Sequence, residues 1–382
     1  MSCMGEQAGR RVTLEVDGAA LAYNFRAVKK QVAPCRILAV LKADAYHVGA
    51  EFMAKQAVAC GADRIGVADL AEALELEKFG LPLQVLGVLM PDEVPVAAEH
   101  GVVCPVNGFA MAETLSREAL KQKKTVRCHV ILDTGMGRFG LRTPEAVEEI
   151  QRIMTLPGLE VEGVYSHFPM GGIPGEEQTL RQIADFRRVL AELAERKITF
   201  KLRHFAASDG ITCQEEAIRE PFNMVRLGLL WYGHCRNEHG ARLGLRPALR
   251  LRTVVGAVRE LPAGMTVGYF RTCKLAKKTP VATVCAGYAD GLPLALSNRG
   301  RVLIHGVSCP ILGRLSMDYI TVDVSNVPGE VTWGTPVTLW GRDGAEEIEI
   351  EEWAQLKNTH CHDILCAVGN RVRRVYREAP TA

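Results

Sequence analysis

A lysine at the end of a short apolar run is the residue of this sequence best suited to covalent chemistry. Lys42 follows the run Ile37–Leu41, and Asp44 and Tyr46 come soon after it. A short apolar run rich in branched residues predicts a buried parallel strand. A lysine at the tip of such a strand is costly to bury unless it has a partner or forms a covalent bond, for example a Schiff base. The alternative is a solvated lysine at a strand end.

Further polar side chains follow other apolar runs in the same way. They are the loop Asp133–Arg138 after Arg127–Leu132, His167 after Val161–Ser166, Ser208 after Lys201–Phe205, and Arg226 within Met224–Leu229. Taken singly, each has a structural explanation: a solvated loop for Arg138, a satisfied core histidine for His167 and an ion pair for Arg226. Their shared position predicts an active site, because the carboxyl ends of the strands form the catalytic face of a β/α barrel.

The elements that must position these residues are short strands that alternate with amphipathic helices. Eight candidate strands follow an opening strand, Val12–Val16, and a helix from Asp17. They are Ile37–Lys42, Arg64–Val67, Gln84–Val88, Val102–Cys104, Arg127–Leu132, Val161–Ser166, Lys201–Phe205 and Met224–Leu229. This alternation predicts an α/β fold, a (β/α)8 TIM-type barrel over residues 1–240, although residues 11–16 can instead pack with the domain that follows. A doubly wound open sheet is the alternative, but no G-x-G-x-x-G sequence follows any of these strands.

Several helix ends carry their own signals. Asp69 is a candidate N-cap, with Glu72 as its capping-box partner, and the helix should stop at Gly80, before Pro82. Two further helices should open at Asn107 and near Glu176.

The pattern changes after a polar stretch, Arg236–Pro247, which we interpret as a linker. Short strands separated by proline and glycine turns follow it, with little helix. They are Leu249–Val255, Thr279–Ala286, Val302–His305, Ile320–Val324 and Thr335–Leu339. The sequence therefore predicts a C-terminal, mostly-β domain over residues 245–376.

The bulk composition narrows the partners. Lys and Arg number 46 and Asp and Glu 44, a net charge of +2, which favours neither nucleic acid nor a membrane surface. No apolar stretch approaches a membrane span, and the start, Met1–Gln7, carries no export signal, so we expect a cytoplasmic protein whose 12 cysteines are reduced. The cluster His360–Cys366 lacks the spacing of a metal site, and no metal is expected.

These residues belong to a recognisable pattern, and the sequence resembles the alanine racemases, a family of pyridoxal-phosphate enzymes, over nearly its whole length. The matching motifs are Val40–Tyr46, Asp133–Arg138, Met224–Gly233, Val267–Tyr269, Gly287–Gly291, Gly313–Asp318 and Arg371–Tyr376. The family fold is a barrel followed by a β-domain. The activity that the resemblance implies is the interconversion of L-alanine and D-alanine, which can supply D-alanine for biosynthesis.

The resemblance also implies a role for each residue. Lys42 would carry pyridoxal 5'-phosphate and act as one base, and Tyr269 would act on the opposite face. The other cofactor-binding residues would be Tyr46, His167, Ser208, Arg226, Gly228, Leu229 and His362. Arg138, Tyr288, Met317 and Asp318 would meet the substrate. In the family the β-domain of one subunit covers the barrel of the other, so the resemblance implies a homodimer with composite active sites.

Four positions depart from the family pattern. Ile131 stands where the family commonly has a carbamylated lysine that holds the carboxylate-binding arginine. Leu294 replaces an arginine at the substrate entrance, and Ala207 replaces an asparagine of the phosphate loop. His362 replaces a tyrosine that touches the phosphate and narrows the pocket, a change able to admit a side chain larger than methyl.

Three alternatives therefore stay open beside an alanine racemase. A serine or broad-specificity racemase is favoured by His362 and Leu294. A fold-related pyridoxal-phosphate decarboxylase is disfavoured by Arg226, because such enzymes place an acidic residue at the ring nitrogen. A cofactor carrier made of a single barrel is disfavoured by the β-domain and Tyr269.

Overall fold

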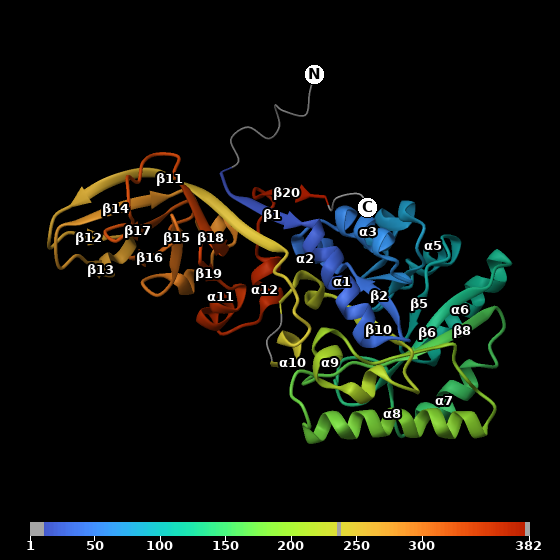
Figure 1. Ribbon diagram of the computed structural model, residues 1–382. Helices are drawn as coiled ribbons and strands as arrows, with labels where there is room; N and C mark the ends of the chain where they lie inside the picture. Colours follow the sequence, from blue (N-terminus) through green and yellow to red (C-terminus); the bar gives the residue numbers. More distant parts are fainter. Residues whose placement is uncertain (1–10, 235–237, 379–382) are drawn as a thin grey trace. The chain divides into compact units, whose positions relative to one another are not determined.

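The computed structural model describes residues 11–234 and 238–378. They form two compact units (Figure 1). The barrel unit holds the described residues of 22–45 and 50–246, and the β-unit holds those of 1–21, 46–49 and 247–382. The boundary crosses α2 (Lys42–His47), so that Tyr46 falls in the β-unit. No helix among the described residues is long and apolar enough to cross a membrane.

The barrel unit is built on eight parallel strands. They are β2 (Arg36–Val40), β3 (Arg64–Val67), β4 (Leu83–Val85), β5 (Cys104–Val106), β6 (Val126–Asp133), β8 (Leu159–Tyr165), β9 (Leu202–His204) and β10 (Met224–Leu227). Their spatial order is β4-β3-β2-β10-β9-β8-β6-β5. The two ends of this sheet meet, because Val103 N donates to Leu83 O at 2.8 Å and Val85 N donates to Val103 O at 3.1 Å. The predicted barrel is therefore confirmed, and the open sheet was wrong.

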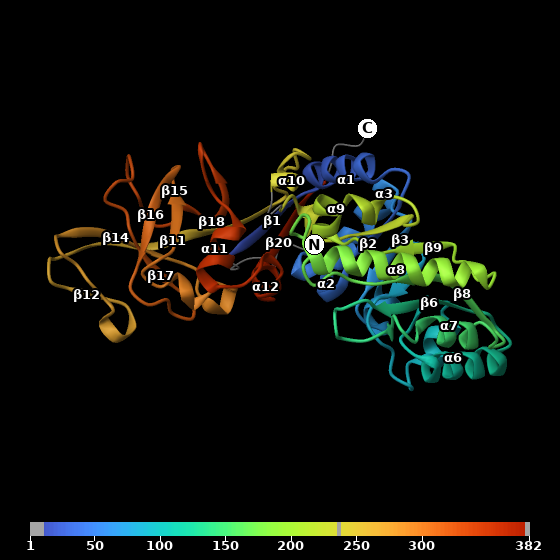
Figure 2. The ribbon, with the colours of Figure 1, turned by 90° about the horizontal axis from the view of Figure 1, so that it is seen from below.

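Helices surround these strands (Figures 1 and 2). They are α1 (Gly18–Val32), α3 (Ala50–Cys60), α4 (Leu70–Leu76), α5 (Val94–Glu99), α6 (Phe109–Gln122), α7 (Ala146–Ile153), α8 (Glu177–Glu195) and α9 (Ser208–Cys213). The helix expected at Asn107 begins at Phe109, whose N donates to Glu149 Oε1 at 2.7 Å. Glu176 caps α8 by accepting from Gln178 N and Thr179 N at 3.1 and 2.6 Å, which confirms a helix near that residue.

The start of α4 differs from the prediction in one respect. Asp69 is the N-cap and accepts from Glu72 N at 3.0 Å, as expected. The Glu72 carboxylate, however, accepts from Ala68 N at 2.7 Å and from Ala43 N at 2.6 Å. The predicted capping box is thus replaced by a bond to the segment after Lys42. The helical segment ends as expected, at Gly80 with φ 74°.

The β-unit contains a second sheet. Its strands are β1 (Thr13–Asp17), β11 (Leu249–Leu261), β14 (Thr279–Val284), β15 (Arg301–Ile304), β16 (Val307–Leu312), β17 (Ile320–Asp323), β18 (Pro336–Asp343), β19 (Glu346–Ile348) and β20 (Arg373–Arg377). Strands β11 and β18 also pair, which closes six of them into a ring. All five predicted strands appear, but β16, β19, β20 and the helices α11 (Ile350–Lys357) and α12 (Cys361–Cys366) were not predicted.

The opening strand lies in this second sheet. Strand β1 pairs antiparallel with β11, where Thr13 faces Arg252. It pairs parallel with β20, where Thr13 faces Arg373. The opening strand therefore contributes to the β-unit rather than to the barrel.

Candidate active site

Five neighbouring barrel strands deliver the predicted polar residues to one rim. The order β2-β10-β9-β8-β6 places the segments after these strands side by side. Within four residues of the ends of these strands lie, in the same order, Lys42, Gly228, Ser208, His167 and Thr134. Because all five strands are parallel, their carboxyl ends share one face of the barrel. The structure thus brings together the barrel residues that the sequence singled out.

Lys42 begins a left-handed turn. Ala43, Asp44, Ala45, Tyr46 and His47 all have positive φ, between 51° and 61°. This conformation costs a non-glycine residue about 1–2 kcal/mol, so a run of five needs support from its surroundings. Lys42 itself is exposed in the single chain, so the burial expected of a lysine at a strand tip is not seen there.

Hydrogen bonds to other residues of the barrel unit hold the first three residues of the turn, Ala43–Ala45. Glu72 Oε1 accepts from Ala43 N at 2.6 Å. The phenol of Tyr232, which is fully buried, donates to Ala45 O at 2.8 Å. Asp44 Oδ1 accepts from Ala50 N at 2.6 Å. These bonds come from separate elements, so the backbone after Lys42 is fixed from several sides.

Arg226 is the buried cation of the rim, and only 5% of it is exposed. Its Nη2 donates to the carbonyls of Ser166 and Phe205, both at 2.8 Å, and to His167 Nδ1 at 3.0 Å. Its Nη1 donates to His204 Nδ1 at 3.0 Å. Because arginine only donates, a neutral His167 must carry its hydrogen on Nε2. Burial lowers the pKa of Arg226 to about 10, which leaves the guanidinium charged at neutral pH.

Ser208 lies beside the segment that follows β10. Its Oγ accepts from Leu230 N at 3.1 Å, which joins the start of α9 to the turn that begins at Leu229. Gly228 and Leu229 are buried at the start of that turn. A hydroxyl and adjacent backbone amides at a chain turn are suited to an anion such as phosphate.

Arg138 ends a loop that Asp133 organises. Asp133 Oδ1 accepts from Gly135 N and Gly137 N, both at 3.0 Å. Arg138 is exposed, and its guanidinium lies 4.7 Å from the centre of the Phe139 ring. Among the described residues no carboxylate lies within 4.0 Å of it. Ile131 is buried and offers no anion. An aromatic ring, that of Phe139, and not an anion is therefore the neighbour of the Arg138 guanidinium in the single chain.

Tyr46 and His362 meet in the β-unit. Their ring centroids are 5.2 Å apart, with the rings edge to face at 75°. Tyr46 is only 4% exposed, and burial raises the pKa of its phenol above the ordinary value. His362 is half-buried in α12. The two residues expected near a phosphate are thus neighbours of each other.

The C-terminal strand holds the segment that follows Tyr46. Arg374 in β20 donates to His47 O from two nitrogens, at 3.0 and 2.8 Å. The hydroxyl of Tyr376 donates to Val48 O at 2.9 Å. The closing motif therefore anchors the last residue of the left-handed turn and the residue that follows it.

Tyr269, Tyr288, Met317 and Asp318 lie on neighbouring loops of the β-unit. The loop of Tyr269 is close to that of Met317, because a Cβ added at Gly268 would approach Arg314 N to 2.7 Å. The loop of Tyr288 is bonded to the same segment: Tyr288 N donates to Ser316 O at 3.1 Å, and Ala289 N donates to Met317 O at 3.0 Å. Tyr269 is 64% exposed and Met317 52% exposed in the single chain. These two side chains face solvent in the single chain.

Arg371 ties two of these loops together, a role that was not predicted for it. It donates to both oxygens of the buried Asp290, at 2.7 and 2.8 Å, and to Asp318 Oδ1 at 2.7 Å. These carboxylates raise the pKa of Arg371 above its ordinary value. Its place in the closing Arg-rich motif was the available signal. Glu72 was predicted only as a capping residue, and its contact with Ala43 had no signal because the two residues are distant in sequence.

The described residues contain no group of three or more His, Cys, Asp or Glu side chains placed to hold a metal ion. The cluster at His360–Cys366 instead forms the start and body of α12. His360 and His362 contact each other through their rings, with centroids 5.6 Å apart.

Comparison with known proteins gives a consistent result. Residues 16–236 match the family described as alanine racemase, N-terminal domain, and residues 248–376 match alanine racemase, C-terminal domain. The chain is 37% identical over 366 residues to an alanine racemase of Symbiobacterium thermophilum, covering 95% of this chain and 96% of the relative. It is 34% identical over 368 residues to one of Methanococcus maripaludis, covering 95% and 97%.

Solved structures agree. The alanine racemase of a D-cycloserine-producing Streptomyces lavendulae superposes with a TM-score of 0.90 at 32% identity, covering 98% of each chain. The enzyme of Bartonella henselae with covalently bound pyridoxal phosphate gives 0.85 at 28% identity, covering 96% of this chain and 99% of that one. The enzyme of Bacillus anthracis with bound L-Ala-P gives 0.87 at 32% identity, covering 97% and 96%.

Proposed function

The chain belongs to the alanine racemase family and is an isomerase, and from this premise we propose a two-base mechanism for exchanging L- and D-alanine. Lys42 would be one base and Tyr269 of a second copy the other. The observation that carries the proposal is the barrel rim, where His167, Ser208, Arg226 and Lys42 come from four neighbouring strands.

The rim residues fit pyridoxal 5'-phosphate. Within the described residues every hydrogen bond of Arg226 leaves from Nη1 or Nη2, so its Nε–H remains available to an acceptor such as a pyridine nitrogen. Ser208 and the amides of Gly228 and Leu229 would hold the phosphate, with Tyr46 and His362 as further contacts. The cofactor, when bound, supplies the electron sink that makes the α-proton of an amino acid acidic. The B. henselae relative with covalently bound pyridoxal phosphate supports this assignment.

Arg226 would decide which reaction follows. A guanidinium donates a hydrogen bond but does not give up its proton near neutral pH, so an acceptor held by Arg226 stays unprotonated. This weakens the electron sink and favours rapid return of the proton. A decarboxylase of this fold would instead place an acidic residue at the ring nitrogen. Among the described residues no carboxylate lies within 4.0 Å of Arg226. The decarboxylase alternative is disfavoured for this reason.

Two bases on opposite faces would provide the inversion. A single base tends to return a proton to the face it came from, whereas Lys42 and Tyr269 can remove it on one face and supply it on the other. Tyrosine ordinarily titrates near pH 10, so its phenolate needs support. Nε2–H of His167, whose Nδ1 accepts from Arg226, is able to donate that support.

The substrate carboxylate would meet groups from two copies of the chain. Arg138 would supply a guanidinium, and Met317 a backbone amide, with Tyr288 and Asp318 nearby. The large exposed fractions of Tyr269 and Met317 in the single chain support a homodimer in which the β-unit of one copy meets the barrel of another. The B. anthracis relative with bound L-Ala-P supports a small amino acid as substrate.

The proposal is tested by trapping the cofactor and following both enantiomers. Borohydride reduction of the wild type should attach the cofactor to the peptide containing Lys42, and Lys42→Ala should abolish this mass shift. Lys55→Ala, at an exposed lysine of α3, serves as the matched control. Absence of a labelled Lys42 peptide would contradict the proposal. Failure of added alanine to exchange its α-proton with deuterated water would favour a carrier.

Tyr269→Phe separates the two bases. This variant should retain the cofactor and handle L- and D-alanine unequally, because only one face loses its base. Tyr23→Phe in α1 should treat both enantiomers as the wild type does. Equal losses for both enantiomers in Tyr269→Phe would argue against a two-base mechanism. Cytoplasmic location and use of the product in D-alanine biosynthesis stay predictions.

A further inference from the structure

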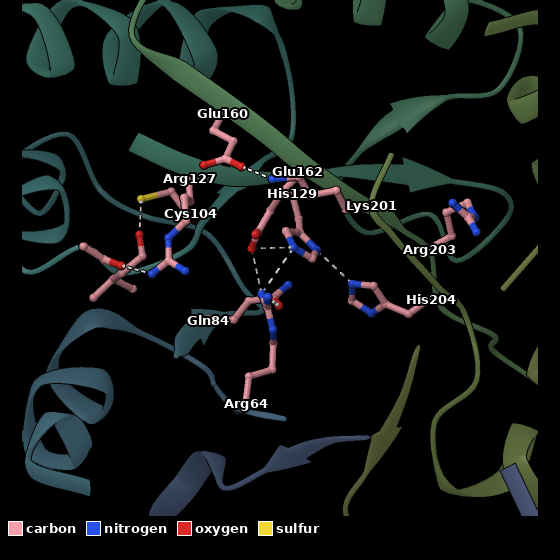
Figure 3. A network of polar contacts seen from close by, with 12 residues as sticks. Arg64, Gln84, Cys104, Arg127, His129, Glu160, Glu162, Lys201, Arg203 and His204 are labelled. Carbon is pink, nitrogen blue, oxygen red and sulfur yellow. Dashed lines mark hydrogen bonds and ion pairs between the residues drawn. The ribbon is translucent and has the colours of Figure 1, made fainter. Parts of the chain in front are cut away.

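A line of buried polar side chains, of which Figure 3 shows His204, His129 and Glu162, crosses the interior of the barrel. It runs from Arg226 through His204 and His129 to Glu162. The successive distances are 3.0 Å between Arg226 Nη1 and His204 Nδ1, 3.0 Å between His204 Nε2 and His129 Nδ1, and 3.2 Å between His129 Nε2 and Glu162 Oε1. Both imidazoles are fully buried. The two-base mechanism gives these three deeper residues no part.

The hydrogen bonds in this line can run in only one direction. Arginine is solely a donor, so His204 Nδ1 must accept. A neutral His204 then carries its hydrogen on Nε2 and donates it to His129 Nδ1. His129 in turn carries its hydrogen on Nε2 and donates it to Glu162. Burial lowers the pKa of His129 to about 4 and that of His204 well below its ordinary value, which supports neutral rings.

Glu162 ends the line because another cation holds it. Arg64 Nη1 donates to Glu162 Oε1 at 2.9 Å and to Gln84 Oε1 at 3.1 Å. The same nitrogen lies 3.3 Å from His129 Nε2, but that atom already carries a hydrogen in the direction set by Arg226. Burial alone would raise the pKa of Glu162, yet the bonds from His129 and Arg64 lower it to about 2. The carboxylate is therefore charged.

Close packing fixes the imidazole of His129 and that of His204. A Cβ added at Gly163, which faces His129 across β6 and β8, would lie 2.3 to 2.7 Å from three atoms of the His129 ring. The ring of His204 stacks on Tyr165, with centroids 4.7 Å apart and an interplanar angle of 14°. Neither ring can turn without displacing its neighbour, so the line is held by shape as well as by hydrogen bonds.

Arg226 needs a countercharge that its direct neighbours do not supply. Its hydrogen-bond partners are carbonyls and imidazoles, and its guanidinium lies 5.6 Å from the centre of the Tyr165 ring. Among the described residues no carboxylate lies within 4.0 Å of Arg226. A buried cation without compensation is costly. The dipoles of the two neutral imidazoles are aligned between Arg226 and the carboxylate of Glu162. Each imidazole polarises the next, so the negative charge of Glu162 stabilises the guanidinium of Arg226 through them.

We propose that Glu162 is a positioning residue for Arg226. It acts through His129 and His204, whose tautomers it sets, and these tautomers fix the orientation of the Arg226 guanidinium at the rim. The tautomer part of this inference stands on the barrel alone, and its catalytic consequence rests on the proposed function. Glu162 thereby controls how firmly Arg226 presents its free N–H to the cofactor ring, without touching cofactor or substrate.

The tautomers are read directly by imidazole ¹⁵N NMR of the full chain labelled in histidine and saturated with pyridoxal phosphate. His129 and His204 should both show protonated Nε2 and unprotonated Nδ1. In Glu162→Gln the amide can still accept, but its charge is lost, so the ¹⁵N shifts of both rings should move. Gly163→Ala should move the same resonances by displacing the His129 ring, with no charge removed.

Catalysis supplies the second measurement. Glu162→Gln should lower kcat by about 10- to 100-fold with little change in KM, because misaimed catalytic groups cost rate more than binding. Gln84→Leu is the matched control: it removes a neighbour of Arg64 and leaves the line from Arg226 to Glu162 intact. It should leave the His204 resonance and kcat as in the wild type. Where Glu162→Gln fails to fold, Arg64→Met combined with Glu162→Leu removes both charges together and should shift the His204 resonance in the same way.

Two results would overturn the inference. One is a wild-type spectrum in which either ring carries its hydrogen on Nδ1. The other is a Glu162→Gln protein in which only His129 responds while His204 and kcat stay unchanged, since Glu162 would then merely neutralise Arg64. A wild type with the expected tautomers but no racemisation would instead contradict the proposed function and leave the hydrogen-bonded line established.

Discussion

Glu72 Oε1 accepts a 2.6 Å hydrogen bond from the backbone N of Ala43, the first residue after Lys42. The other oxygen of the same carboxylate accepts from Ala68 N at 2.7 Å. One side chain of α4 thus joins the end of β3 to the left-handed turn that follows the proposed catalytic lysine. Both carboxylate oxygens are needed for this.

Glu72→Gln should weaken the support of Lys42. An amide has only one acceptor oxygen, so one of the two backbone N–H groups must lose its partner. We expect a loss of about 1–3 kcal/mol in unfolding free energy and a lower kcat/KM for alanine. Urea unfolding and racemisation rates measure these quantities. Glu75→Gln, at an exposed position of the same helix, should change neither. Wild-type stability in Glu72→Gln would show that water replaces the lost acceptor.

Arg371→Lys should loosen the loops that present Met317 and Asp318. Arg371 contacts Asp290 through two nitrogens and Asp318 through a third, a pattern that a single ammonium cannot reproduce. We expect KM for alanine to rise about tenfold with a smaller change in kcat, because binding rather than chemistry loses its support. Steady-state kinetics in both directions test this. The exposed Arg377→Lys is the control, and an unchanged KM in Arg371→Lys would contradict the prediction.

Co-expression of Lys42→Ala with Tyr269→Ala should restore activity that neither variant has alone. In a composite site, a mixed dimer places both defects in one site and leaves the other site intact. Random pairing then gives about a quarter of wild-type activity, since half of the dimers are mixed and each has one good site. Differently tagged copies allow the mixed dimer to be purified and assayed. A mixed dimer with no activity would mean that each site is built from one chain.

The specificity of the enzyme should be visible in the ratio of kcat/KM for D-alanine and D-serine. One added hydroxyl is discriminated by only a few kcal/mol in a small pocket, so some serine turnover is expected. Where His362 shapes the pocket, His362→Tyr should reduce serine turnover more than alanine turnover. A wild type that clearly prefers serine would revive the serine racemase alternative.

Folding stability should fall when the pH drops below about 6.5. Burial depresses the pKa of His129 from 6.5 to about 4, so in this window the unfolded chain binds a proton that the folded chain refuses. His204 acts in the same direction, and Glu162, with its pKa of about 2, adds a further loss at lower pH. Each such group contributes up to about 1.4 kcal/mol per pH unit.

Unfolding curves at fixed protein concentration between pH 7.5 and 4.5 measure this slope. His129→Phe should be less stable at pH 7 yet show a shallower decline. His305→Asn is the control, because His305 is exposed and its φ of 51° suits asparagine. An equally steep decline in His129→Phe would assign the effect to other groups.

Strands whose apolar runs end in clear breaks were predictable from the sequence. The strand Arg64–Val67 was predicted to the residue, because Asp63 and Asp69 flank a short branched run. Strand β5 was placed two residues early, since Val102 and Val103 are as apolar as the strand itself. Strand β16 was missed because Pro310 interrupts its pattern.

The rim of the site was predictable and its support was not. Polar residues just after apolar runs mark the ends of barrel strands, so Lys42, Ser208 and Arg226 could be named. The left-handed turn at 43–47 contains no glycine or asparagine that would signal positive φ. The line from Arg226 to Glu162 joins residues far apart in sequence, and only the closed barrel makes them neighbours. The catalytic and binding roles given to the site residues stay predictions.

The pairing of β1 with β20 has a consequence for the order of synthesis. Thr13 faces Arg373, so one edge of the earliest described strand has no partner strand until residue 373 has left the ribosome. The barrel needs no such late partner and can form while translation continues. The β-unit must wait, and with it Tyr269 and the loops tied by Arg371. A nascent chain is thus expected to hold a finished barrel well before it holds its second base.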